Sequence, residues 1–415
     1  MAFEVRLALR HLRAGGWQTV LILGGVAMAV TLVIFVSGLI YGLQQRLIST
    51  ITGSVAHISL NAPERVPRTI ERLPGHGRET LVVSARQQRP WQPDTIDQCR
   101  CLEQQIATFD HVVAVAPEVT GQALVTRAGG EKSVRVVGSP PLQQDRIARL
   151  DEDLVQGDYL HLQPDQAVIG YELAKELGVV LGDRIRLTTA AGVTQTFRIA
   201  GIVYSGAEVV DSATVFVTLR AGQTLFGTGT LLTTFAVKLD DPFQANKVGD
   251  AMATALDLEV DTWMRQNPEL LSALRAQSGS AAMISVFSLV ASGFAIASVL
   301  IVSVLKRSKE IGILKAIGAR SRQILIVFTL EGLVIGIAGA VVGALIGSAV
   351  LLGLQSIRQP VRVPGVEAEP LFPGAISSGL LVVTMMAAVV ITVVASILPA
   401  RQAAKLDPVD VIRGA

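Results

Sequence analysis

Four long apolar stretches without a charged residue divide the chain. These intervals contain 32, 30, 26 and 31 residues, and they lie between Arg13 and Arg46, Arg275 and Lys306, Glu331 and Arg358, and Glu369 and Arg401. A helix needs about 20 apolar residues to cross a bilayer. The pattern therefore predicts four transmembrane helices, with apolar cores at residues 17–43, 281–305, 324–354 and 375–398.

The first apolar stretch follows Arg6, Arg10 and Arg13, which is the charge pattern of a signal peptide. Its apolar run is much longer than the usual 7–15 residues, and no clear small-x-small cleavage site follows it. We therefore expect a retained anchor, preceded by a cytoplasmic amphipathic helix at 1–16.

The basic residues are distributed unevenly between the two sides of the predicted membrane. Residues 1–16, 306–323 and 399–415 together carry 12 Lys and Arg, whereas 44–280 carries 22 in a segment more than four times as long. Cytoplasmic flanks are enriched in Lys and Arg. Both termini and the 306–323 loop are thus expected in the cytoplasm, with 44–280 and the short 355–374 loop outside.

The composition excludes several classes of protein. The 415 residues have a mean hydropathy of +0.49, with 50% hydrophobic and 17% charged residues, which is too apolar for a fully soluble enzyme or a disordered chain. A net charge of +2 and 5% aromatic residues offer neither bulk attraction nor stacking surfaces for nucleic acid. The 44–280 segment carries 22 basic and 27 acidic residues, as suits a soluble folded domain.

The 44–280 segment alternates short β-rich runs with helical ones. Strands are predicted at 112–116, 124–126, 133–137, 184–188, 196–203, 214–219 and 233–239. Helices are predicted at 171–177, before Gly178, and at 242–256, after Asp241. The predicted fold is an α-helical membrane protein with four transmembrane helices and a large α+β extracytoplasmic domain inserted between helices 1 and 2.

Two features of this segment have no assigned role. The Pro- and Arg-rich stretch 61–94 reads as a long surface loop or as a docking or gating loop. Cys99 and Cys101 are the two cysteines of the chain, and a bridge across one intervening residue is strained and rare. We expect no functional role for them, with an interchain disulfide or redox effect as the alternative.

Candidate catalytic chemistry is weak. The run from Gly129 to Ser133 lacks the spacing of a phosphate loop and predicts a hairpin turn. The five histidines are scattered, and neither a metal-binding cluster nor a nucleophile motif is present in the sequence. His57 alternates with apolar residues, which favours a structural histidine over a ligand. The sequence thus predicts no catalytic residues and no metal site.

The third apolar stretch combines a row of glycines with one carboxylate. Most successive glycines are four residues apart, which brings them to one face for close helix packing: Gly332, Gly336, Gly339, Gly343 and Gly347. Glu331 is the one ionisable residue inside the predicted spans, where a carboxylate is costly. A packing or interfacial role is favoured over a proton or ion site, because no second intramembrane charge could relay protons.

The predicted cytoplasmic loop contains an amphipathic segment that Gly318 can end. If helical, it places Ile311, Leu314 and Ile317 on one side, flanked by Lys309 and Lys315. Such a helix can dock its apolar face on a cytoplasmic partner or lie on the anionic inner leaflet, and composition favours neither.

The chain resembles the MacB/LolC/LolE/FtsX family of ABC transporter permeases over essentially its full length. The resemblance rests on "KEIGILKAIGARSRQI" from Lys309, "TLEGLVIGIAGAVVGALIG" in the third stretch and the ending "LPARQAAKLDPVDVIRG". In the external domain, "VIGYELAKELGVVLGDRIRL" from Val168 resembles the periplasmic core domain of the family.

The resemblance implies a non-catalytic permease subunit in the cell inner membrane with its large domain in the periplasm. A separate cytoplasmic ABC ATPase would supply ATP and Mg, so that this chain binds no cofactor, and two permease chains, identical or different, would form the transporter. The residues that contact the ATPase would be Lys309, Glu310, Ile311, Leu314, Lys315, Ile317, Gly318 and Arg320. A periplasmic adaptor or acceptor protein is a further potential partner.

Two functions are compatible with the resemblance. One is a transporter that exports or extracts an amphiphile such as a lipoprotein, lipid, peptide or drug, by transmitting ATPase movements to the external domain. The other is an FtsX-like signalling module that activates a periplasmic cell-wall enzyme without transport. The length of 44–280 favours the first.

Overall fold

The computed structural model describes residues 10, 16–63, 95–96, 100–127, 130–256, 258–360 and 368–405. The expected helix at 1–16 and most of the 61–94 stretch lie outside this part of the chain. The chain divides into two compact units, one of which contains residues 1–46, 272–362 and 367–415, and the other residues 47–271 and 363–366. We call them the helical unit and the α/β unit.

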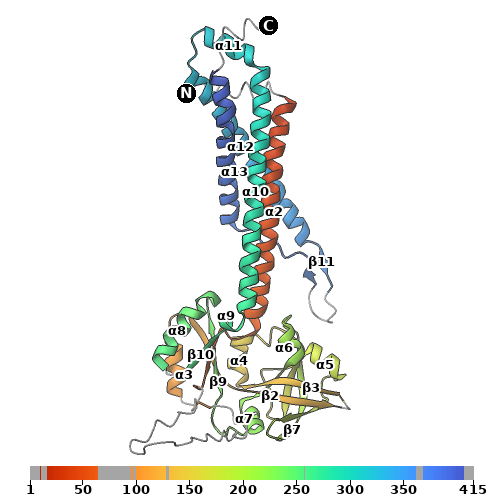
Figure 1. The fold of residues 1–415 in the computed structure, drawn as a ribbon. Coiled ribbons are helices and arrows are strands. Elements are labelled where there is room, and N and C mark those ends of the chain that lie inside the picture. The colour runs from red at the N-terminus through yellow and green to blue at the C-terminus, as the bar shows by residue number, and fades with distance from the viewer. Residues whose placement is uncertain are drawn as a thin grey trace, which may run out of the picture. The chain divides into compact units, whose positions relative to one another are not determined.

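The helical unit is built on four long apolar helices (Figure 1), which confirms the prediction of four helical segments. They are α2 (Trp17–Ser54), α10 (Pro268–Lys306), α12 (Ser321–Gln355) and α13 (Ser378–Lys405). All four are long and apolar enough to cross a membrane. The α2 and α10 helices continue beyond the apolar runs that predicted them. A short helix, α11 (Ser308–Ala316), and a two-strand ladder, β11 (Arg358–Gln359) with β12 (Glu369–Pro370), complete the unit.

The glycines of α12 allow two other helices to approach it closely. A Cβ atom added at Gly332 or Gly336 would meet Ser396 or Thr392 of α13 at 2.6–3.1 Å. Farther along, added Cβ atoms at Gly339, Gly343 and Gly347 would meet side chains or backbone of α2 at 2.5–3.2 Å. The row of glycines therefore contacts α13 with its first part and α2 with its second.

The first part of the α/β unit is a four-stranded antiparallel sheet with the order β10-β1-β9-β2. Its strands are β1 (Ile58–Asn61), β2 (Val112–Arg127), β9 (Thr234–Leu239) and β10 (Glu259–Thr262). The helices α3 (Arg100–Ala107) and α8 (Ala245–Leu256) follow β1 and β9, which gives the β-α-β-β-α-β order of ferredoxin-like folds. Apolar residues of both helices pack with β1 and β9 in one buried cluster.

The second part of the α/β unit is a closed ring of strands inserted between β2 and β9. The ring runs β2-β3-β8-β5-β7-β6 and returns to β2 through the pairing of residues 123–126 with 186–189. Its other strands are β3 (Gly130–Ser139), β5 (Gln166–Gly170), β6 (Arg184–Thr189), β7 (Thr194–Val203) and β8 (Thr214–Thr218), and β4 (Leu154–Gly157) pairs with β7 outside the ring. Inward-facing residues such as Val136, Phe197 and Val215 form its core.

Short helices complete the α/β unit. They are α4 (Pro141–Ala148), α5 (Tyr171–Leu177), α6 (Glu208–Ala213), α7 (Leu219–Phe226), a 3-10 turn η1 (Pro242–Gln244) and α9 (Trp263–Gln266). The predicted helix at 171–177 is confirmed, and Gly178 ends it with φ +62°, a conformation that glycine adopts without strain. The predicted helix at 242–256 divides into η1 and α8, and Asp241 accepts a hydrogen bond from the Phe243 N–H (2.9 Å).

The predicted strands are present, with one correction. The runs 112–116 and 124–126 belong to the single strand β2, which continues through Pro117. A proline fits there because the strand changes partners: β9 pairs with residues 112–118 and β3 with residues 119–127. The Ser139 hydroxyl donates to the Pro117 carbonyl (2.9 Å) at this point. The run from Gly129 to Ser133 was predicted as a hairpin turn; residues 130–133 instead belong to β3, which forms an antiparallel hairpin with β2 in which Gly130 pairs with Arg127.

Cys101 is disulfide-bonded in the structure. Cys99, the other cysteine of the sequence, lies outside the described residues. Cys101 thus forms a disulfide although the sequence suggested that a bridge across one intervening residue would be strained and rare, and a functional role for the cysteines stays untested.

Candidate functional site

An apolar groove with a volume of about 440 Å³ lies among three long helices of the helical unit. Val33 and Ile40 of α2, Leu289 of α10, and Val383 and Ala387 of α13 line it. This volume lies within the range of pockets that hold small molecules. The groove therefore offers space for an apolar chain.

Polar side chains lie at the end of the groove where α2 approaches the α/β unit along the chain. The Gln44 amide donates to the Leu274 carbonyl (3.0 Å) and to the Ser278 hydroxyl (2.9 Å), and Tyr41 lines the groove beside it. Farther along, the Ser37 and Ser285 hydroxyl oxygens are 3.4 Å apart. The groove is thus amphipathic, with hydrogen-bonding groups toward one end and aliphatic side chains toward the other.

The segment between α10 and α12, which the sequence makes amphipathic if it is helical, does form a helix, α11. Its apolar residues do not share one exposed side. Ile311 is 2% exposed and packs in the helical unit with Val304, Phe328 and Ala400, whereas Ile317 is 81% exposed. The arrangement expected from the sequence is therefore wrong for Ile311, because the chain's own long helices cover it.

The exposed face of α11 and the residues after it differs from the predicted one. Ile313 is 53% exposed and lies four residues before Ile317, and Lys309, Glu310 and Arg320 are exposed around them. Lys315 instead turns inward, and its ammonium donates to the Ala404 carbonyl of α13 (3.0 Å). Leu314 is half-buried, and Gly318 adopts φ +109° after the helix. Ile313 was not among the predicted contact residues, although its i, i+4 spacing with Ile317 could have indicated it.

Glu331 lies in α12 with 3% of its surface exposed. Its Oε2 atom has no hydrogen-bond partner among the described residues, and the charge of Arg307 acts on the carboxylate. Gly332 beside it packs against Ser396. Glu331 therefore lies in a tight helix contact, near the α11 end of α12.

The last turn of α2 lies within the α/β unit, where the side chain of Lys238 in β9 binds its carbonyl groups. The Lys238 ammonium donates to the carbonyls of Thr52 (2.6 Å), Gly53 (2.9 Å) and Val55 (3.4 Å), and to the Ile147 carbonyl at the end of α4 (2.6 Å). A cation at a helix C-terminus also interacts favourably with the helix dipole. The sequence did not indicate Lys238, which reads there as one polar position in an apolar strand.

His57 also binds the end of α2, and we call the hydrogen bonds of Lys238 and His57 to this end the Lys238 joint. The Leu239 N–H donates to Nδ1 (3.1 Å), so the ring carries its hydrogen on Nε2 and donates it to the Thr52 carbonyl (3.1 Å). Burial, and then the charge of Lys238, lower the pKa of His57 to about 4. His57 is therefore a neutral structural histidine with both nitrogens paired.

Metal-binding chemistry is not supported in the described part of the chain, where no three His, Cys, Asp or Glu residues are grouped to hold an ion. The features that can carry a function are the amphipathic groove, the exposed face of α11 and the Lys238 joint.

Comparison with known proteins identifies the family. Residues 19–255 match the MacB-like periplasmic core domain, and residues 282–408 match the FtsX-like permease C-terminal domain. The chain is 23% identical to the lipoprotein-releasing system transmembrane protein LolC of Xylella fastidiosa, over 99% of this chain and 98% of that protein. It is 24% identical to the macrolide export ATP-binding/permease protein MacB of Hyphomonas neptunium, over 99% of this chain and 60% of that protein.

Among solved structures, the periplasmic region of MacB from Actinobacillus actinomycetemcomitans covers 53% of this chain and 95% of that chain, with 12% identity and a TM-score of 0.32. The four apolar helices and the two domain matches define a membrane permease of the ABC transporter class. The chain belongs to the family with a MacB-like periplasmic core domain and an FtsX-like permease domain, which includes proteins named LolC and MacB.

Proposed function

We propose that this chain is a permease subunit that couples ATP hydrolysis by a separate cytoplasmic ATPase to movements of its external domain, and thereby exports or extracts an amphiphilic substrate. It would work with a second permease chain in the cell inner membrane, with both termini in the cytoplasm. ATP and Mg would be bound by the ATPase. The observation that carries the proposal is the amphipathic groove among α2, α10 and α13.

The exposed face of α11 supports coupling to an ATPase. Ile313 and Ile317 form a small apolar patch, and Lys309, Glu310 and Arg320 are exposed around it. Buried apolar anchors with a polar rim are the usual composition of a protein interface. The inner side of α11 is tied to the long helices through Ile311 and Lys315, so a force applied to the exposed face would reach α12 and α13.

Replacement of Ile317 by Asp should separate ATPase binding from folding. Because Ile317 is 81% exposed, we expect unchanged thermal unfolding but at least a tenfold loss of co-purified cognate ATPase and of its stimulated activity. Ile311→Asp should instead lower the unfolding temperature, because Ile311 is buried. Val180→Asp adds the same charge to an exposed apolar site of the α/β unit and should change neither. Normal ATPase binding by Ile317→Asp would contradict the coupling role.

The groove supports an amphiphile as substrate. Aliphatic side chains line most of it, whereas Gln44, Tyr41 and Ser278 lie at one end. An amphiphile can match this pattern by placing its apolar chain among the aliphatic residues and its polar group beside the hydrogen-bonding side chains. The positive-inside distribution of Lys and Arg would direct that end toward the external side of the membrane.

Filling the groove should block substrate handling without uncoupling the ATPase. Ala282 lines the groove and is exposed, so Ala282→Trp should reduce amphiphile stimulation of ATPase activity about tenfold in reconstituted vesicles, with basal activity unchanged. Met283→Trp is a matched control, because Met283 is 65% exposed and does not line the groove. In cells, Ala282→Trp should cause a lipoprotein or another amphiphile to accumulate in the inner membrane. A cell-wall defect with normal amphiphile distribution would favour the signalling alternative.

A further inference from the structure

The first half of β2 is a free sheet edge between two helices. Residues 112–118 pair with β9 on one side, and among the described residues no strand pairs with 112–116 on the other side. The Glu118 carbonyl accepts from the Thr233 N–H beside β9 (3.0 Å), whereas the Pro117 carbonyl turns away to Ser139. Backbone direction alternates along an antiparallel strand, so the N–H and C=O of Val115 also point to the free edge.

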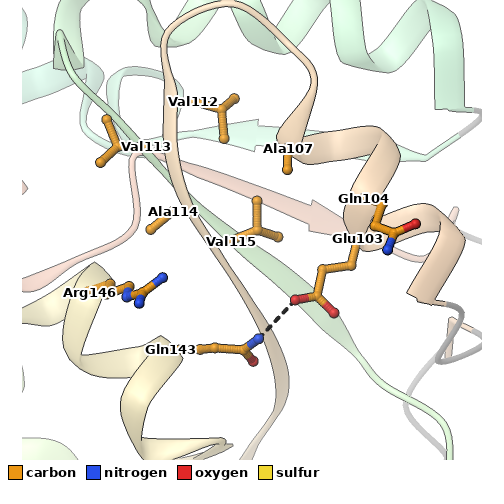
Figure 2. Close-up of a pocket in the computed structure, with 9 residues that line it drawn as sticks. All are labelled: Glu103, Gln104, Ala107, Val112, Val113, Ala114, Val115, Gln143 and Arg146. Atoms are coloured by element: carbon orange, nitrogen blue, oxygen red, sulfur yellow. Dashed lines mark hydrogen bonds between the residues drawn. The ribbon is translucent and has the colours of Figure 1, made fainter.

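Beside this edge lies a groove with a volume of about 520 Å³ (Figure 2). Residues 112–115 line it together with Glu103 and Gln104 of α3 and Gln143 and Arg146 of α4. Val113 is 64% exposed at a register shift between Val112 and Ala114. The free edge of β2 therefore lies between α3 and α4, and the N–H and C=O of Val115 are available there for hydrogen bonds.

The two helices lie on opposite faces of the sheet. Val115 packs in the buried cluster that contains Ile106 of α3, whereas Ala114 packs with Ile147 of α4. Side chains of a strand added to this edge would alternate between these faces. One set would meet Glu103 and Gln104, and the other would meet Gln143 and Arg146.

We propose that this groove binds an extended segment of a partner protein, which adds as a strand to the free edge of β2 and carries a basic residue next to an acidic one. Main-chain hydrogen bonds to β2 would supply affinity, and the side chains of α3 and α4 would supply specificity. On the α3 side of the groove, Glu103 faces one set of the segment's side chains. On the α4 side, Arg146 faces the other set. Because neighbouring residues of a strand belong to different sets, a basic residue next to an acidic one fits best. This inference does not depend on the proposed transport function.

One internal contact must open for the segment to bind. The Gln143 amide donates to Glu103 Oε1 (2.8 Å) and so links α4 to α3 beside Val115 (Figure 2). An incoming basic side chain would take the Glu103 carboxylate from Gln143, because an ion pair with hydrogen bonds is stronger than a neutral amide contact. Gln143→Ala should therefore increase binding two- to fivefold.

Photo-crosslinking to the full chain in lipid nanodiscs tests the proposal. The probe is an eight-residue peptide of Val and Thr residues with a central Lys-Glu pair and one benzoylphenylalanine. We expect saturable labelling at residues 112–115. Glu103→Lys should reduce labelling at least fivefold and restore it for a Glu-Glu peptide, whereas Arg146→Glu should do the same with restoration by a Lys-Lys peptide.

Two controls make the result decisive. A peptide with proline in place of its Val residues keeps the Lys-Glu pair but cannot complete a strand ladder, and it should not label the groove. Arg220→Glu changes an exposed arginine away from the groove and should leave labelling unchanged. Absent labelling, labelling insensitive to both charge reversals, or equal labelling by the proline peptide would overturn the proposal. A second copy of this chain as the occupant would appear as a crosslinked dimer that excess peptide does not displace, and it would also overturn it.

Discussion

Replacing Lys238 by Met should destabilise the α/β unit by about 2–4 kcal/mol. The ammonium group holds carbonyls at the end of α2 and the Ile147 carbonyl of α4, and the Thr52 and Ile147 carbonyls belong to buried residues. Methionine fills the same space but leaves these acceptors without a donor. The loss of a buried partner costs the desolvation of the group left behind, which explains the large expected effect.

The fluorescence of Trp263 provides a local readout. Trp263 is 2% exposed, and its backbone N–H donates to the carbonyl of His57 (3.1 Å), whose side chain contacts the end of α2. In a background with Trp17 and Trp91 replaced by Phe, the urea midpoint for Trp263 should fall in Lys238→Met. Lys247→Met removes an exposed lysine from α8 and should leave the midpoint unchanged. Equal midpoints for Lys238→Met and the parent would show that the lysine does not support the joint.

Glu118→Gln should stabilise the same unit at alkaline pH by up to about 3 kcal/mol. Burial raises the pKa of Glu118 from 4.5 to about 7, although the charge of Arg135 and the hydrogen bond from Gln144 oppose the shift. Between these two pH values the folded chain binds more protons than the unfolded chain. The contribution of Glu118 to stability therefore falls as the pH rises from 4.5 to 7, and it stays low above pH 7.

The measurement is the difference in unfolding free energy between the parent and Glu118→Gln across pH 4–9. We expect little difference at pH 4, a growing advantage of the neutral amide through pH 7, and a plateau above it. Glu131→Gln is the control, because Glu131 is exposed and should give nearly parallel curves. Parallel curves for Glu118→Gln as well would show that this carboxyl group is not shifted.

The sequence alone predicted the four long helices of the helical unit, because each is marked by a long apolar interval without a charged residue. Each of the four intervals contains more residues than the roughly 20 that a helix needs to cross a bilayer, and four such intervals are typical of a membrane protein. Local chemistry also predicted α5 correctly, since Gly178 supplies the left-handed residue that ends it. For β2, the sequence predicted two strands instead of one. The single strand passes from one partner to the other between Glu118 and Val119, and this depends on the positions of β9 and β3 in the sheet.

In the candidate sites, too, contacts with segments distant in sequence decide features that the sequence did not predict. The α11 segment was found from its amphipathic pattern, but which of its apolar residues are exposed was decided by contacts with α12 and α13. Lys238 gave no signal because the carbonyls that it binds come from residues 52–55 and from Ile147. The free edge of β2 likewise exists only once the strand order is known.

The chain by itself therefore determined the number of apolar helices, the α+β character of the inserted domain and the family. Those properties depend on composition and local periodicity, which neighbouring residues carry. Only the tertiary structure decided that Ile317 is exposed and Ile311 buried, that Lys238 holds the end of α2, and that a groove opens beside Val115. These properties depend on which surfaces are covered by segments distant in sequence, and the pattern of neighbouring residues does not predict that packing.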